Sequence, residues 1–322
     1  MNASSRSTPE KPRSGRPLSG WLVLDKPPGL GSTQGVSAVK RALRQGGYAK
    51  TKVGHGGTLD PLAEGVLPVA LGEATKLAGR MLDARKIYRF TLRFGVETDT
   101  LDAEGAVIAT SDRRPALAEV EAVLARFTGV IAQVPPAYSA LKVDGQRAYD
   151  LARAGKAVAL AAREVTIDRL AICRAEAAMP GGPIDHVTLE AEVSKGTYIR
   201  SLVRDIAQAL GTCGHVTFLR RIKAGPFTES QSISLDKLEE AAKGQRLEHL
   251  LLPLEAGLDD IPALHLDQTG AQAVRQGRVL SGMPHPSGLY LAKLGTVPVA
   301  LMEIADGTAR VVRGFNCPDV AE

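Results

Sequence analysis

The sequence predicts an α+β fold followed by a small β-rich domain. Within the first 255 residues, some segments repeat apolar residues at helical spacing. Other segments there alternate apolar and polar side chains with the period of two that is typical of half-buried strands. Beyond residue 256, the chain has short apolar runs separated by glycines, as expected of a small β domain.

The folded part is predicted to begin with a strand and a helix. Residues 20–25 form a short apolar run, and the string Lys26-Pro27-Pro28-Gly29 after it predicts a turn. A helix should follow, because apolar residues recur at helical spacing up to a pair of glycines. These residues are Val36, Val39 and Leu43, and the glycines are Gly46 and Gly47.

Later elements alternate in the same way. Residues 88–94 and 187–193 have strand periodicity, whereas residues 116–128 and 197–210 have helical periodicity and end at glycines. A last helix is predicted through Leu235, Leu238 and Leu247. Residues 133–149 contain two prolines and Gly145, so we expect an irregular functional loop there.

We expect three parts in the chain. Residues 1–18 mix Ser, Pro, Arg and Lys without periodicity, which predicts a disordered basic tail. Residues 19–255 should form the larger domain, and residues 256–322 should form the small β domain.

Composition limits the classes of function. The formal net charge of +5 permits a polyanionic partner without requiring one. Cys173, Cys213 and Cys317 are scattered, so we expect reduced thiols and no metal site. No apolar run reaches the roughly 18 residues of a membrane helix, and the N-terminus lacks the apolar stretch of a signal peptide. We therefore expect a cytoplasmic protein that does not enter a membrane.

The most informative stretch is residues 54–76. Gly54, Gly56 and Gly57 surround His55 and precede Asp60, which indicates a tight loop that presents this carboxylate. An alternative is that Asp60 is only the N-cap of a short helix that begins at Pro61.

Residues 54–68 read Gly-His-Gly-Gly-Thr-Leu-Asp-Pro-Leu-Ala-Glu-Gly-Val-Leu-Pro, and Leu-Gly-Glu-Ala-Thr-Lys follows at 71–76. This long string resembles the catalytic segment of the TruB family of tRNA pseudouridine synthases. The resemblance implies that uridine is isomerised to pseudouridine at nucleotide 55, in the T loop of tRNA, without cofactor or metal. It also implies a mixed, mainly antiparallel sheet flanked by helices, and a PUA-like RNA-binding C-terminal domain.

Further motifs extend the resemblance. Residues 194–200 read Ser-Lys-Gly-Thr-Tyr-Ile-Arg, a string in which the family pairs Arg200 with the catalytic Asp60 and places Tyr198 beside the target nucleotide. A guanidinium beside a carboxylate favours its ionised form, which suits nucleophilic attack. Without the resemblance, Arg200 would be assigned to a solvated helix face.

The resemblance implies three more substrate contacts. Tyr88, in a Lys-x-Tyr-x-Phe string, would stack on the base, although on periodicity alone it is a core aromatic. Leu219 would border the uridine, and His55 would take the vacated place in the RNA stack. Gly56 stands where the family usually has threonine, which removes any hydroxyl contact at that position.

Basic residues outside the motifs are candidates for phosphate contacts, namely Lys142, Arg147, Arg153, Arg220, Arg221 and Lys223. Asp99 and Asp102 are interpreted as turn formers that cap their own backbone.

The partner expected from the resemblance is the T stem-loop of tRNA, bound by a monomer that needs no protein partner. Two alternatives stay open: a guide-RNA-dependent synthase subunit of the box H/ACA type, and a non-catalytic protein that binds or folds tRNA.

Overall fold

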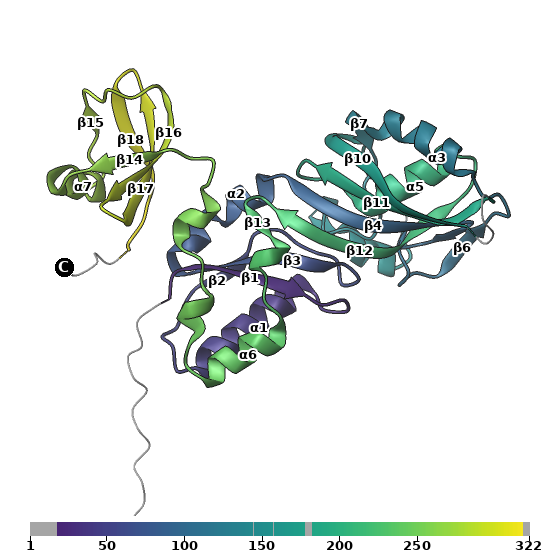
Figure 1. The fold of residues 1–322 in the computed structure, drawn as a ribbon, viewed down its shortest axis with the longest axis horizontal. Coiled ribbons are helices and arrows are strands. Elements are labelled where there is room, and N and C mark those ends of the chain that lie inside the picture. The colour runs from purple at the N-terminus through teal and green to yellow at the C-terminus, as the bar shows by residue number, and fades with distance from the viewer. Residues whose placement is uncertain (1–17, 144, 157, 178–181, 318–322) are drawn as a thin grey trace, which may run out of the picture.

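A computed structural model describes residues 18–143, 145–156, 158–177 and 182–317. Two sheets dominate it: a large one built from the first 230 residues and a small one near the C-terminus (Figure 1). The expected tail, apart from Leu18, lies outside the described residues.

The large sheet has nine strands, and its main path runs β1-β3-β12-β4-β11-β10-β7. β3 and β12 pair in parallel and the other neighbours are antiparallel, so the expectation of a mixed, mainly antiparallel sheet is confirmed. The strands are β1 Gly20–Lys26, β2 Val53–His55, β3 Glu64–Leu71, β4 Lys86–Phe94, β7 Gly129–Gln133, β10 Arg163–Ala177, β11 Ile184–Val193, β12 Gly214–Ala224 and β13 Phe227–Thr228.

Helices pack on the large sheet and complete its core. α1 (Ser32–Gln45) packs beside α6 (Leu235–Lys243), and both lie below β1 in Figure 1. At the other end of the sheet, α3 (Leu117–Leu124) lies near α5 (Ile199–Ala209), which packs against β12. The two ends share one apolar cluster. The predicted helix through Leu247 is too long, because α6 ends at Lys243 and Leu247 starts a separate 3-10 turn.

Shorter elements fill the connections. The helices are α2 Ala78–Asp83, α4 Ala148–Arg153 and α7 Gln268–Arg275, and 3-10 turns cover Gly72–Leu77, Ala125–Phe127, Glu229–Gln231, Leu247–Leu250 and Leu254–Gly257. Two hairpins pair β5 (Val96–Thr98) with β6 (Val107–Thr110) and β8 (Lys142–Val143) with β9 (Gln146–Arg147). The last hairpin and α4 lie in the segment that was expected to be irregular.

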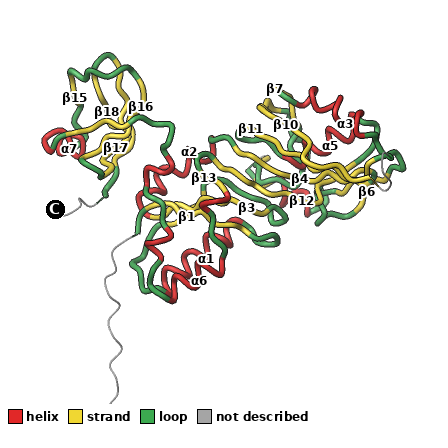
Figure 2. The backbone as a smooth tube through the Cα atoms, in the orientation of Figure 1, coloured by secondary structure: helices red, strands yellow, loops and turns green. Residues whose placement is uncertain are grey.

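The C-terminal sheet has the order β14-β16-β17-β18-β15, and α7 packs against it (Figure 2). Its strands are β14 Ala263–Leu266, β15 Leu280–Ser281, β16 Gly288–Leu294, β17 Val297–Ala305 and β18 Thr308–Gly314. The expected β-rich domain is therefore present. Its Leu291, Leu301 and Phe315 join an apolar cluster with Trp21 of β1, which links the two sheets.

Within the described ranges, no helix combines the length and apolar character needed to cross a membrane.

Candidate active site

Asp60 lies in a loop, residues 56–63, between β2 and β3. No helix begins at Pro61, so the helix-cap alternative is wrong. Gly57 has a φ of +131°, a conformation that favours glycine. At Gly65, where φ is +97°, a Cβ would lie 2.3 Å from the carbonyl oxygen of Arg221. Glycine is therefore required both before and after Asp60.

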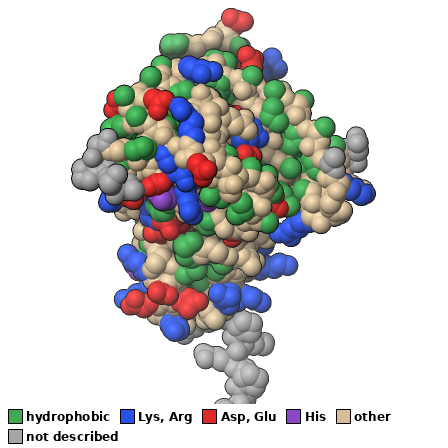
Figure 3. Space-filling model, turned by 90° about the vertical axis from the view of Figure 1, so that its right-hand side faces the viewer, with side chains coloured by type: hydrophobic (Ala, Val, Ile, Leu, Met, Phe, Trp, Pro, Cys, Tyr) green, Lys and Arg blue, Asp and Glu red, His purple; other side chains and the backbone are tan. Residues whose placement is uncertain are grey.

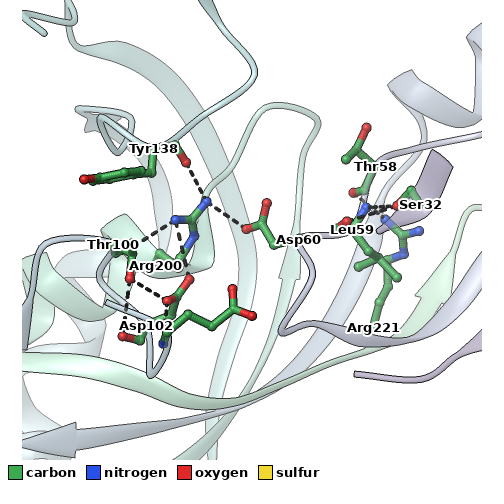
Figure 4. A network of polar contacts seen from close by, with 10 residues as sticks. Ser32, Thr58, Leu59, Asp60, Thr100, Asp102, Tyr138, Arg200 and Arg221 are labelled. Carbon is green, nitrogen blue, oxygen red and sulfur yellow. Dashed lines mark hydrogen bonds and ion pairs between the residues drawn. The ribbon is translucent and has the colours of Figure 1, made fainter. Parts of the chain in front are cut away.

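Side chains from the first strand and helix hold the residues on either side of Asp60. The buried hydroxyl of Ser32 accepts a hydrogen bond from the Leu59 N–H at 2.8 Å and donates one to the Leu59 carbonyl at 3.0 Å (Figure 4). The Lys26 ammonium donates to the Pro61 carbonyl at 3.1 Å. Burial lowers the pKa of Lys26 to about 8. Lys26 and Ser32 thus fix the position of Asp60 from both sides.

Arg221 supports the same loop from β12. Its guanidinium donates to the carbonyls of Val66 at 2.8 Å, Gly57 at 3.1 Å and Thr58 at 3.4 Å, and the residue is 1% exposed. The residue supplies backbone hydrogen bonds to the loop and also lines a cavity beside Asp60. These hydrogen bonds occupy the guanidinium, and the phosphate contact of Arg221 stays a prediction.

Arg220 is also occupied. It forms ion pairs with Asp25 at 3.1 Å, with Glu64 at 3.0 Å and with Glu229. Three carboxylates neutralise this cation, which disfavours a phosphate contact, and the contact of Arg220 stays a prediction. Lys223, further along β12, is partly exposed and has no ion pair among the described residues, so its phosphate contact stays a prediction.

The Asp60 carboxylate meets Arg200, which lies in the first turn of α5. The Oδ2 atom of Asp60 is 2.9 Å from Nη2 of Arg200, and Asp102 Oδ2 lies 3.6 Å from Nη1 (Figure 4). Arg200 also donates to the carbonyls of Thr100 at 2.8 Å and Tyr138 at 2.9 Å. The Asp60 side chain is 36% exposed, whereas the Arg200 side chain is 6% exposed. A buried and fixed guanidinium therefore pairs with an accessible carboxylate.

A cavity of about 320 Å³ opens beside Asp60. Tyr88, Tyr198 and Leu219 line it, so the structure brings these expected substrate contacts together. Lys86 lines it as well, and burial together with the charge of Arg221 lowers its pKa to about 8. The cavity combines two aromatic rings, an apolar side chain and cationic groups around one carboxylate.

A second cavity, of about 560 Å³, shares Asp60 and Arg200 with the first. Lys142, Arg147 and Arg153 line its outer wall and are exposed. Figure 3 shows a row of Lys and Arg side chains on the face at the β7 and α3 end of the molecule. These exposed cations remain suitable for contacts with a polyanion.

His55 lines the second cavity from the end of β2. Its ring is half-buried, and its Nδ1 has no hydrogen-bond partner within the described part of the chain. Burial, reinforced by the charge of Arg221, lowers the pKa of His55, which favours the neutral ring. A neutral, partly exposed ring next to Asp60 can stack on a base.

Gly56 has a packing reason. A Cβ at this position would lie 2.5 Å from the Cβ of Met81 in α2. Threonine at position 56 would require Met81 to move. The glycine that replaces the usual threonine therefore allows α2 to pack closely against the loop.

Three residues at the site were not singled out from the sequence. Asp102 does cap its turn, since it accepts hydrogen bonds from Thr100 Oγ1 and the Glu104 N–H, but it is also a partner of Arg200. Ser32 could not be found from local sequence, because its partner Leu59 is 27 positions away. Lys86 stands in the Lys-x-Tyr-x-Phe string, but the sequence does not reveal that it lines the cavity.

Comparison with known proteins gives consistent matches. Residues 43–199 match the model of the TruB family pseudouridylate synthase (N terminal domain), and residues 200–259 match the tRNA pseudouridylate synthase B C-terminal domain. The chain is 65% identical to tRNA pseudouridine synthase B of Novosphingobium aromaticivorans, over 95% of this chain and all of the relative. It is 58% identical to the protein of that name from Zymomonas mobilis, over 93% and 96% of the two chains.

Solved structures give a more distant likeness. A chain in the structure of an H/ACA RNP bound to a substrate RNA containing 2'-deoxyuridine has a TM-score of 0.69 at 25% identity, over 93% of this chain and 86% of that one. A chain of the archaeal box H/ACA sRNP Nop10-Cbf5 complex has a TM-score of 0.68 at 24% identity, over 93% and 87%.

Proposed function

Since this chain belongs to the TruB family of pseudouridylate synthases and isomerises uridine to pseudouridine in tRNA, we propose that Asp60 is its catalytic carboxylate. The observation that supports this role most directly is the pairing of an accessible Asp60 with a buried Arg200 at the mouth of a nucleotide-sized cavity. The guanidinium favours the ionised carboxylate that an attack on sugar or base requires.

The remaining roles follow from the two cavities. In our proposal the target is uridine 55 of the T loop, flipped out of its stack into the smaller cavity. Tyr88 stacks on the detached base, while Tyr198 and Leu219 border the nucleoside. His55 occupies the place that the uridine leaves. Lys142, Arg147 and Lys223 are proposed to contact RNA phosphates.

The isomerisation leaves the elemental composition of the nucleotide unchanged. The bond between C1' and N1 breaks, the base turns, C1' bonds to C5, and the proton from C5 is replaced by one at N1. These steps require a carboxylate, a surface that retains the free base and exclusion of water. In our proposal Asp60 supplies the carboxylate, while Tyr88 and Leu219, which line the same cavity, retain the base and exclude water.

We further propose that the chain acts in the cytoplasm as a monomer, without a guide RNA, and that residues 256–322 contribute RNA contacts. The relatives named tRNA pseudouridine synthase B cover nearly the full chain, which favours the stand-alone enzyme over the box H/ACA alternative.

The test uses an unmodified T-arm transcript labelled with tritium at C5 of uridine, without guide RNA. The protein should release tritium, and Asp60→Asn should abolish release while RNA binding persists. Asp150→Asn, which changes an exposed carboxylate of α4, is the matched control and should retain activity. Release that survives Asp60→Asn would falsify the assignment of Asp60. Release that needs a guide RNA would favour the box H/ACA alternative, and binding without release by the unaltered protein would favour the non-catalytic one.

A further inference from the structure

A basic groove lies outside both active-site cavities. It has a volume of about 970 Å³ and runs between α1 and the segment 48–53 that leads into β2. Four exposed cations line it, namely Lys40 and Arg44 from α1 and Lys50 and Lys52 from the segment. No Asp or Glu of the described residues lines the groove.

The four cations are not neutralised by the fold. None has an ion pair with a residue in the described ranges. Arg41, on the neighbouring face of the same helix, instead pairs with Glu239 of α6 at 3.6 Å. Glu248, which contacts the groove-lining residue Tyr48, accepts a hydrogen bond from the Tyr48 hydroxyl. The groove therefore keeps an uncompensated positive charge, which favours a polyanionic ligand.

Two elements, α1 and β2, contribute both to the groove and to the cavity that contains Asp60, although no residue lines both. Gln34 lines that cavity, and Ser37, Lys40 and Arg44 follow it at spacings of three and four residues, which places them on one exposed face of α1. At 1.5 Å per residue, Lys40 and Arg44 lie about 9 and about 15 Å along the helix from Gln34. β2 makes a second connection, because Val53 lines the groove and His55 lines the cavity.

We propose that this groove binds backbone phosphates of the same RNA whose uridine enters the site of Asp60. The separation along α1 between Gln34 and the cations Lys40 and Arg44 corresponds to roughly three to four base steps at about 3.4 Å each, so the groove lies within a few nucleotides of the cavity that contains Asp60. The contacts are to phosphate and add affinity without base specificity. This inference extends the proposed function, since it names a second surface for the same partner.

The test measures binding apart from chemistry. The probe is a T-arm transcript whose target uridine is replaced by cytidine, titrated at several salt concentrations. The double variants Lys40→Gln/Arg44→Gln and Lys50→Gln/Lys52→Gln should each raise Kd about five- to tenfold near 0.1 M salt. Each should lower the slope of log Kd against log salt by about 1 to 2, the value expected for one or two lost phosphate contacts. All four side chains are exposed, so both variants should unfold like the unaltered protein.

Arg41→Gln is the control, because it removes a cation from the same helix but not from the groove. It should change Kd less than twofold. The proposal would be overturned if both double variants had the same Kd, and the same slope of log Kd against log salt, as Arg41→Gln. In the tritium assay, kcat/KM should fall by the factor seen in Kd. If the unaltered protein releases no tritium, the proposed function fails, while the binding result still decides whether the groove binds RNA.

Discussion

The loop of residues 56–63 and the segment of residues 134–156, which share the wall of the second cavity, are held by different means. The loop has no regular structure of its own, yet buried side chains from β1, α1 and β12 donate hydrogen bonds to its backbone. The segment is anchored near its start, where Ser201 donates to the Val134 carbonyl and Arg200 to the Tyr138 carbonyl. Further along, its basic side chains are exposed.

This difference separates two tasks. A carboxylate that acts on a nucleotide has to be positioned to within a fraction of an ångström, and several independent donors achieve that. A surface that grips phosphates tolerates movement, because the attraction acts over a range of about 10 Å in 0.1 M salt. Changes in the donors to the loop should therefore affect stability and kcat, whereas changes in the exposed segment should affect KM.

The largest effect is expected for Arg221→Met. The change removes the Arg221 donor from the buried carbonyls of Val66 and Gly57, at a cost of about 1 to 3 kcal/mol for each unsatisfied group. We expect the free energy of unfolding in urea to fall by about 3 kcal/mol or more, and kcat to fall about 100-fold. Arg221→Lys keeps the charge but loses the planar guanidinium. Its unfolding free energy and its kcat should lie between those of the unaltered protein and those of Arg221→Met. Unchanged stability in both variants would contradict the structural role assigned to Arg221.

Ser32→Ala should have the next largest effect. It removes one hydroxyl that serves both the N–H and the carbonyl of Leu59, so we expect a loss of about 2 kcal/mol in unfolding free energy. Because Leu59 adjoins Asp60, kcat should fall about tenfold with little change in KM. The control is Ser37→Ala on the exposed face of α1, where the hydroxyl only bonds back to Thr33. Equal kinetics for the two alanine variants would show that Ser32 does not position Asp60.

The sequence predicted most elements of the fold because their periodicity is local. The alternation of apolar and polar residues in β4 correctly predicted that Phe90, Leu92 and Phe94 are buried. The helix through Leu247 was overextended, since Gln245 adopts a φ of +52° after Gly244 and the helix pattern does not reveal that break.

The site was less accessible to sequence reasoning. The family strings pointed to Asp60 and Arg200, which meet although they are 140 positions apart. The two arginines of β12 look alike in sequence, but Arg221 donates to backbone carbonyls whereas Arg220 pairs with three carboxylates. Only tertiary structure distinguishes a phosphate-binding arginine from one that supports a backbone.

An effect on stability alone is expected from the titration of Lys26. Its pKa is about 8 in the folded chain, against 10.5 for an unhindered lysine, so the unfolded chain binds more protons between these values. Stability is therefore lowest below pH 8 and rises towards pH 10.5. Relative to Lys26→Met, the unaltered protein should gain roughly 2 to 3 kcal/mol in unfolding free energy between pH 7 and pH 10. Urea unfolding of both proteins at pH 7 and pH 10 measures this gain. The same difference in unfolding free energy between the two proteins at both pH values would contradict it.

The smallest effect is expected for Lys142→Gln and Arg147→Gln on the exposed wall. Each removes one exposed cation near the second cavity, so KM for a T-arm transcript should rise about threefold at 0.1 M salt while kcat stays constant. Unfolding free energy should change by less than about 0.5 kcal/mol, because neither side chain is buried. At 0.5 M salt the difference in KM should shrink, since screening weakens the contact in both proteins. A fall in kcat at saturating RNA would show instead that the segment of residues 134–156 helps to position the reacting nucleotide. The difference in task between this segment and the loop of residues 56–63 would then no longer hold.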